Sequence, residues 1–315
     1  MNKQVLAVCC TPDGGILRYD LNESGKLSFV DRLNLDRPMY LIREGELFYV
    51  LLNECFPDHT GGLQQLERLR NGSLTAVGEP LSTKGRVPCH LCAWKENIYC
   101  ANYLSGSISC PPDLLAVHHG SGVHPMRQTS PHVHFVCVTP DNRYLAAVDL
   151  GLDQIITYDQ TLGLYAKSQL PAGLGARHLI FSEDGKYAYC VGEMGGTVTT
   201  LRYRDGSFTP LETVSVLPER FHGKNLSAAI RRRGDNLYVS NRGHDSIAWL
   251  TLREESVTPR QWFDCGGASP RDFEVTKQWL ICANEDGNCI TVLNRSDGSI
   301  AECVSAPRPL GIVVL

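Results

Sequence analysis

The sequence predicts an all-β fold, a seven-bladed β-propeller that forms one domain over residues 1–315. Three observations predict it. A unit of three short strands recurs, a polar residue returns at one position of each unit, and the two chain ends resemble parts of a further unit. The clearest unit covers residues 176–203. In it HLIFS, YAYCV and TVTTLRY are the strands, and Asp184-Gly185 marks the hairpin turn between the first two.

The unit returns at a nearly constant interval. Further copies begin at Pro38, Pro88, Val133, Asn225 and Ser269. The second strand of each copy ends in a polar residue, except in the copy that has Gly192 there. These polar residues are Asn53, Asn102, Asp149, Asn241 and Asn284. The interval lies between 43 residues, from Asn241 to Asn284, and 49 residues, from Asn53 to Asn102. A four-stranded unit of about 40–50 residues is typical of a propeller blade.

The seventh unit is divided between the two ends of the chain. The tail RPLGIVVL, residues 308–315, resembles a first strand, while QVLAVCC, GILRYDL and KLSFVDRL near the start resemble the other three. Pairing of residues 308–315 with residues 4–10 would close the ring and leave no free sheet edge. In the first full copy, LQQLERLR also has the spacing of a short amphipathic helix, but the phase of the repeat favours a strand.

Composition and charge restrict the partners and the compartment. The net charge of −4 and the pI near 6.2 argue against nucleic acid, which normally needs a basic face. The sequence contains no run of 18 apolar residues, so we expect no membrane span. The N-terminal segment lacks the apolar length of a signal peptide. The 13 cysteines therefore favour free thiols in the cytoplasm. Cys89 and Cys92 have a zinc-like spacing, but residues three apart on a strand point to opposite faces, so we expect no metal.

The antiparallel strand order predicts where polar side chains gather. The first strand of a unit begins at the rim where the second strand ends, and the first strands line the central channel. One mouth of the channel therefore collects residues from both sets, which are His132, His134, Arg177, His178 and Arg271 from first strands, and Asn102, Asp149, Glu193, Asn241 and Arg242 from the ends of second strands. A concave mouth with convergent polar groups predicts a small-molecule site.

Each candidate also has a structural interpretation. Arg177 and Arg271 suit ion pairs with Glu193 and Asp272, because a guanidinium matches a carboxylate. The asparagines suit turn capping, and imidazoles find hydrogen bonds in most surroundings. Asp153 and Asp245 occupy the same position of their repeats. This periodicity favours a structural role for both residues in turns.

Four segments resemble the seven-bladed β-propeller lactonase family, which includes the propeller-type 6-phosphogluconolactonases and the carboxymuconate-lactonizing enzymes: PHVHFVCVTPDNRYLAAVDLGLDQIITYD, ARHLIFSEDGKYAYCVGE, LYVSNRGHDSIAWL and WLICANEDGNCITVLN. The loop HHGSGVHPMRQTSPHVH, residues 118–134, is similar as well. The resemblance covers almost the whole chain and is weakest over residues 1–70. It implies that the catalytic residues are His134, Arg177, Glu193 and Arg242.

The resemblance implies a hydrolase that opens a sugar lactone, 6-phosphogluconolactone, to 6-phosphogluconate without a cofactor or metal. Glu193 or His134 would activate water, while Arg177 and Arg242 would stabilise the oxyanion or hold a phosphate. The substrate would also be contacted by His132, His178, Arg271, Asn102, Asp149 and Asn241. The sequence has no Gly-x-Ser-x-Gly elbow that would indicate a serine nucleophile.

Two alternatives remain open at the level of the sequence. A carboxymuconate-type cycloisomerase would use the same arginines to bind the carboxylates of its substrate. A non-catalytic propeller would bind a protein or carbohydrate through the rim. No protein partner, nucleic acid or membrane is inferred from the residues.

Overall fold

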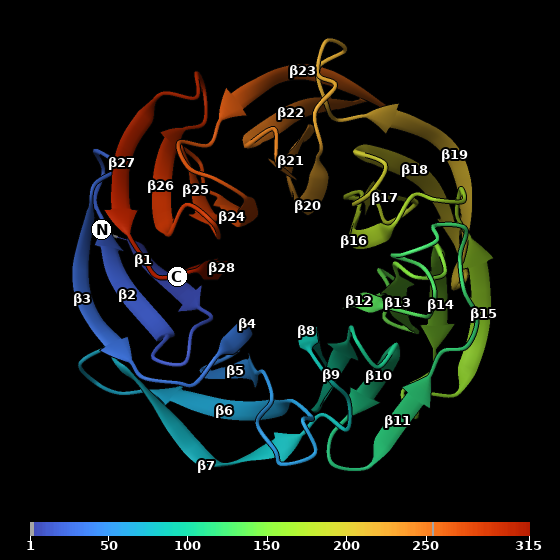
Figure 1. Ribbon diagram of the computed structural model, residues 1–315, viewed down its shortest axis with the longest axis horizontal. Helices are drawn as coiled ribbons and strands as arrows, with labels where there is room; N and C mark the ends of the chain where they lie inside the picture. The colour runs from blue at the N-terminus through green and yellow to red at the C-terminus, as the bar shows by residue number, and fades with distance from the viewer. Residues whose placement is uncertain (1–2, 254) are drawn as a thin grey trace.

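The computed structural model describes residues 3–253 and 255–315, which form seven four-stranded antiparallel sheets around one central axis (Figure 1). Each sheet is one blade, and in six of the blades the strands follow one another outward from the channel in chain order. The predicted seven-bladed propeller is therefore confirmed. None of the described residues forms a helix long and apolar enough to cross a membrane.

The strands occupy four positions in the blades. The innermost strands line the channel and are β4 (Pro38–Glu44), β8 (Pro88–Trp94), β12 (Val133–Val138), β16 (Ala176–Phe181), β20 (Leu226–Arg233), β24 (Pro270–Val275) and β28 (Pro309–Val314). The second strands are β1 (Lys3–Cys9), β5 (Leu47–Leu52), β9 (Asn97–Asn102), β13 (Leu145–Asp149), β17 (Tyr187–Gly192), β21 (Asn236–Arg242) and β25 (Trp279–Asn284). The third strands are β2 (Gly15–Leu21), β6 (Gly62–Arg68), β10 (Ser107–Cys110), β14 (Gln154–Tyr158), β18 (Thr197–Arg204), β22 (Ser246–Arg253) and β26 (Cys289–Asn294). The outermost strands are β3 (Leu27–Leu33), β7 (Leu74–Ser82), β11 (Leu114–Val117), β15 (Leu164–Gln169), β19 (Ser207–Ser215), β23 (Ser256–Asp264) and β27 (Ile300–Ser305).

The apolar core is divided among the contacts between neighbouring blades. In one of these clusters, Trp279 and Ile281 of β25 pack with Val5 and Tyr19 of the adjoining blade. Because a blade has a neighbour on each face, its second strand is buried on both sides, as in β25, where all six residues are buried. This two-sided burial explains why such strands are continuous apolar runs in the sequence and do not alternate.

The ring is closed by the two ends of the chain. Strand β28 pairs with β1 in one sheet, with Val314 opposite Val5 and Ile312 opposite Ala7. Figure 1 shows the two termini in the same blade. The predicted pairing of residues 308–315 with residues 4–10 is confirmed. In the segment LQQLERLR, residues 63–68 belong to strand β6, as the repeat phase predicted, and the last two residues follow the end of the strand.

A β-bulge recurs near the start of the innermost strands. The register with the second strand shifts between Ala176 and His178, for example, which leaves Arg177 without a partner residue. The same shift leaves out one residue in five other blades, which are Met39, Cys89, His134, Arg271 and Leu310. A bulge re-aims the side chain of the extra residue, and all six of these residues line one small cavity in the channel.

Candidate active site

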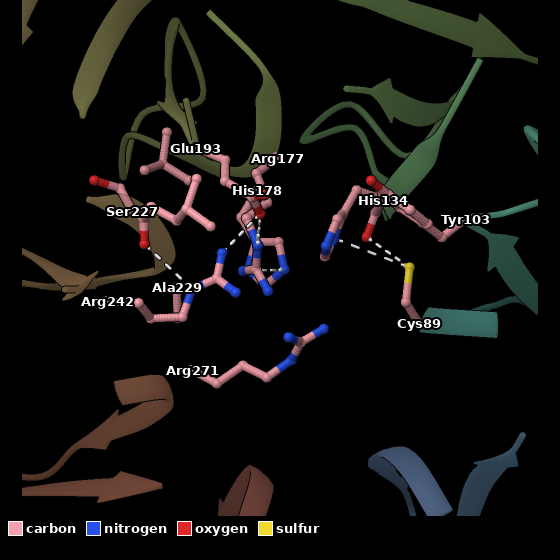
Figure 2. A network of polar contacts seen from close by, with 12 residues as sticks. Cys89, Tyr103, His134, Arg177, His178, Glu193, Ser227, Ala229, Arg242 and Arg271 are labelled. Carbon is pink, nitrogen blue, oxygen red and sulfur yellow. Dashed lines mark hydrogen bonds and ion pairs between the residues drawn. The ribbon is translucent and has the colours of Figure 1, made fainter. Parts of the chain in front are cut away.

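Two cavities lie where the bulged residues meet at the mouth of the channel. The smaller one, about 20 Å³, is lined by the six bulged residues together with Tyr40, His178 and Asp272. The larger one is a pocket of about 990 Å³, and Arg271 lines both cavities. Figure 2 shows Arg177, Arg242, Arg271 and His134 pointing toward one common space. The predicted convergence at one rim is therefore seen for these four residues.

Three guanidiniums surround the carboxylate of Glu193. Arg177 Nε donates to Oε2 at 3.1 Å, and Arg127 Nη2 donates to Oε1 at 2.5 Å. Arg242 Nη2 lies 2.8 Å from Oε2, but the angle is poor for a hydrogen bond, so this contact is an ion pair only. The Glu193 side chain is only 4% exposed. Glu193 thus fixes the positions of arginines that come from three different parts of the chain.

The charges at this site act strongly on one another because they are buried. Burial raises the pKa of Glu193, but Arg242 and Arg177 outweigh it and hold the pKa well below the usual range. Burial and the charge of Arg242 lower the pKa of Arg177 to about 9, and its guanidinium remains charged at neutral pH. Glu193 is therefore an ionised carboxylate of low proton affinity.

His134 is a neutral imidazole beside these charges. Burial, followed by the charge of Arg177, lowers its pKa well below the usual range. Its Nδ1 lies 3.9 Å from Cys89 Sγ. Burial raises the pKa of Cys89 to about 12, so its thiol stays protonated and is not an activated nucleophile. His134 is therefore unprotonated at neutral pH, and burial and Arg177 also lower its affinity for a proton.

His178 and aromatic side chains close the channel beneath the cavity. His178 Nε2 lies 3.0 Å from Arg177 Nη1 and accepts its hydrogen bond. The ring of His178 packs against Phe135, which packs against His90, which in turn packs against Tyr40. His178 therefore supports Arg177, and Arg271 is the residue that the small cavity shares with the larger pocket.

The position of Arg271 corrects one expectation. Its Nη1 donates to Glu285 at 3.0 Å, and it does not pair with Asp272, which instead accepts from Arg231 at 2.7 Å. The bulge is the reason, because it turns Arg271 toward the rim, where Glu285 follows the end of β25. The Arg271–Glu285 pair is the repeat equivalent of the Arg177–Glu193 pair, which is present as expected.

Three candidates lie inside the blades and away from both cavities. Asn102 and Asn241 are fully buried, and their amides donate to the backbone carbonyls of Thr83 and Val216. Asp149 is also fully buried, and its carboxylate lies 2.6 Å from His118 Nδ1 and accepts from the backbone N–H of His132. These contacts are those of structural residues.

His132 and the repeated aspartates have defined local roles. His132 stacks on Tyr103, and its Nδ1 lies 3.1 Å from the Tyr103 carbonyl oxygen. Asp153 has a φ of 51° and accepts the backbone N–H groups of Gly173 and Gly175, at 2.7 and 2.6 Å. Asp245 has a φ of 53° and accepts the N–H groups of two backbone residues in the same way. The predicted turn role of both aspartates is confirmed.

The sequence interpretation missed Arg127 and Lys224, which line the larger pocket. Arg127 lies in the loop between β11 and β12. The similarity of this loop to the lactonase family was visible in the sequence, but its contacts follow no repeat position and could not be predicted. Among residues 3–253 and 255–315, no group of three or more His, Cys, Asp or Glu side chains is placed to hold a metal ion.

Comparison with known proteins agrees with this fold. The model of the seven-bladed β-propeller lactonase family matches residues 4–313. A Staphylococcus epidermidis protein of uncharacterised function is 34% identical over 301 residues, which cover 87% of this chain and 86% of that one. A Bacteroides fragilis structure, provisionally assigned as a 6-phosphogluconolactonase, has a TM-score of 0.90 and 28% identity, and the match covers 100% of this chain and 98% of that one. A Bacteroides uniformis structure with the same provisional assignment has a TM-score of 0.89 and 25% identity, with coverage of 100% and 99%. The chain belongs to the seven-bladed β-propeller lactonase family.

Proposed function

We propose that the protein hydrolyses an anionic sugar lactone, 6-phosphogluconolactone, to 6-phosphogluconate. The observation that carries the proposal is the convergence of cationic side chains at the larger pocket. Arg127, Lys224, Arg242 and Arg271 line it beside the carboxylates of Asp245, Glu285 and Asp286, and Arg177 lines the adjoining small cavity. Planar guanidiniums bind phosphate in a bidentate manner. The provisional assignment of the two Bacteroides proteins supports the same substrate.

The reaction needs a base, an oxyanion site and a route for one proton. In our proposal His134 takes a proton from water as its oxygen adds to the lactone carbonyl, and Arg177 and Arg271 stabilise the oxyanion that forms. The tetrahedral intermediate then collapses, the bond from the carbonyl carbon to the ring oxygen breaks, and the imidazolium of His134 protonates that oxygen. The products are the acid and a free hydroxyl group, and no cofactor takes part.

Glu193 has a different role in this scheme. Because its carboxylate is in contact with three guanidiniums and its pKa is lowered, it is a poor base at neutral pH. Its contacts hold Arg177 and Arg242 in place before substrate arrives, and such preorganisation is the main source of electrostatic catalysis. We assign the role of base to His134, because it lines the small cavity beside Arg177 and its imidazole is ion-paired with no carboxylate or guanidinium among the described residues.

All 13 cysteines are free thiols in the structure. Free thiols are typical of a reducing compartment, and we propose that the enzyme acts in the cytoplasm.

The test is hydrolysis of freshly prepared 6-phosphogluconolactone by the purified protein, followed through the appearance of 6-phosphogluconate. Unphosphorylated gluconolactone and a muconolactone carrying carboxylates are assayed beside it, and spontaneous hydrolysis is subtracted. We expect the highest kcat/KM with the phosphorylated lactone, and a large loss in His134→Gln. A rate no greater than spontaneous hydrolysis would contradict the proposal, and turnover of the muconolactone alone would favour the cycloisomerase.

A further inference from the structure

The loop between β11 and β12 carries Arg127 on a fixed base. The backbone N–H of Arg127 donates to His124 Nδ1 at 3.1 Å. The next residue, Gln128, is fully buried, and its amide donates to the Leu150 carbonyl at 2.8 Å and to Asp153 Oδ2 at 2.7 Å. The loop is therefore tied to the blade through Gln128, directly after Arg127, and the Arg127 side chain is left to adapt to a ligand.

Arg127 differs from the other guanidiniums around Glu193 in its access to the pocket. The side chain of Arg127 is 34% exposed and lines the 990 Å³ pocket, whereas Arg177 is 3% exposed and Arg242 is 11% exposed. Arg127 Nη2 contacts Glu193 and, at 3.4 Å, the Tyr103 hydroxyl. Its Nε and Nη1 donate no hydrogen bond to any residue in 3–253 or 255–315. The guanidinium is thus anchored through Nη2, while the N–H groups of Nη1 and Nε are still available to a ligand.

We propose that Arg127 is the specificity-determining residue that binds the phosphate of the substrate; this inference rests on the proposed function and deepens it. The reacting carbonyl and the phosphate lie at opposite ends of 6-phosphogluconolactone. When the carbonyl reaches His134 and Arg177 at the small cavity, the phosphate remains in the larger pocket, which Arg127 and Lys224 line.

The anchored position of Arg127 suits this role. A guanidinium that Glu193 already holds loses less side-chain entropy on binding than a free surface arginine does. Its planar guanidinium can contact the Glu193 carboxylate through Nη2 while Nη1 donates to a phosphate in the pocket. Lysine carries its donors on a single nitrogen and lacks the rigid planar group that holds the two contacts apart.

The first measurement is selectivity between the two lactones. We compare Arg127→Gln and Arg127→Lys with the matched control Arg143→Gln, which removes an exposed arginine paired with Asp205 far from the pocket. The ratio of kcat/KM for 6-phosphogluconolactone over gluconolactone should fall about tenfold or more in Arg127→Gln, through KM, and by an intermediate factor in Arg127→Lys. The control should keep the wild-type ratio. An unchanged ratio in Arg127→Gln would overturn the inference.

The second measurement does not depend on catalysis. Binding of 6-phosphogluconate and of gluconate is titrated calorimetrically with the same variants, after thermal unfolding shows that they are folded. Arg127→Gln should weaken 6-phosphogluconate binding about tenfold and leave gluconate binding within about twofold. Equal weakening of both ligands would mean a purely structural role and would overturn the inference. If neither lactone is hydrolysed, the proposed function fails, and the titration still decides whether Arg127 recognises the phosphate.

Discussion

At the scale of single residues, Glu193 concentrates the charge of the site. It is a nearly inaccessible carboxylate that touches Arg127, Arg177 and Arg242, so its removal would leave three guanidiniums without their shared counterion. A buried charge without a partner is costly, and breaking such a pair by removing one member typically destabilises a protein by about 3–5 kcal/mol.

Glu193→Gln should therefore lower the free energy of unfolding at pH 7 by about 3–5 kcal/mol. The pKa of Glu193 is lower in the folded protein than in the unfolded chain, so the stability that it contributes is present above the unfolded pKa of about 4.3 and is lost as the pH falls below it. The difference in the free energy of unfolding between variant and wild type should therefore shrink as the pH is lowered from 5 to 3. Chemical denaturation at several pH values measures this difference. Glu46→Gln is the control, because Glu46 is 90% exposed in its pair with Arg43. A difference that is constant with pH would contradict the assignment.

His134→Gln tests the base. It removes the imidazole and keeps a polar side chain, so kcat for the phosphorylated lactone should fall by about 10²-fold, the usual scale for a lost general base. KM and the melting temperature should change little. Near-normal kcat in this variant, together with a large loss in a stably folded Glu193→Gln, would return the base assignment to Glu193.

At the scale of elements, the bulge and the turn that precedes it place the catalytic side chains. The bulge turns Arg177 into the small cavity. Asp153 holds the start of β16 from the neighbouring blade, since its carboxylate accepts the N–H groups of Gly173, Gly175 and Ala176. This turn connects the stability of the blade to the position of Arg177.

Asp153→Ala should lower the free energy of unfolding by about 3 kcal/mol or more, because it leaves buried backbone donors unsatisfied. It should also lower kcat/KM through displacement of Arg177. Denaturation and kinetics on the same preparation measure both effects. Asp297→Ala is the matched control, because Asp297 accepts from Ser299 in an exposed turn and should cost far less. An equal loss of unfolding free energy in the two variants would contradict the role of Asp153 in holding the start of β16.

At the scale of the whole molecule, the propeller is stable as a closed ring. Strand β28 is the innermost strand of the blade that also contains β1, β2 and β3, and Leu310 of β28 completes the wall of the small cavity. The closing blade therefore serves both the fold and the site.

Deletion of residues 308–315 should abolish the cooperative unfolding transition, because it exposes the edge of β1 and removes part of the core between two blades. Circular dichroism during chemical denaturation measures this. Deletion of Leu315 alone is the control, because it lies beyond the end of β28 and its loss leaves the pairing of β28 with β1 intact, at the cost of one backbone hydrogen bond to Gln4 and one partly buried side chain. A normal transition in the eight-residue deletion would contradict closure by β28.

Much of this molecule follows from the sequence by itself, because the relevant interactions are local. Strand periodicity and turn residues recur within each unit of 43 to 49 residues, so the number of blades and the divided seventh blade are visible in one chain. Antiparallel pairing within a hairpin also brings Arg177 beside Glu193, which follows it by sixteen residues.

Only the tertiary structure decided the remaining contacts, because they depend on geometry between blades. Arg231 reaches Asp272 from the neighbouring blade, and the bulge at Arg271 turns that side chain toward Glu285. Arg127 reaches Glu193 across 66 residues from a loop outside the repeat, and no local pattern specifies such a contact. The bulge also has no sequence pattern of its own. It turns Cys89 of β8 into the small cavity, whereas Asn102, on the neighbouring strand β9, keeps its side chain inside the blade.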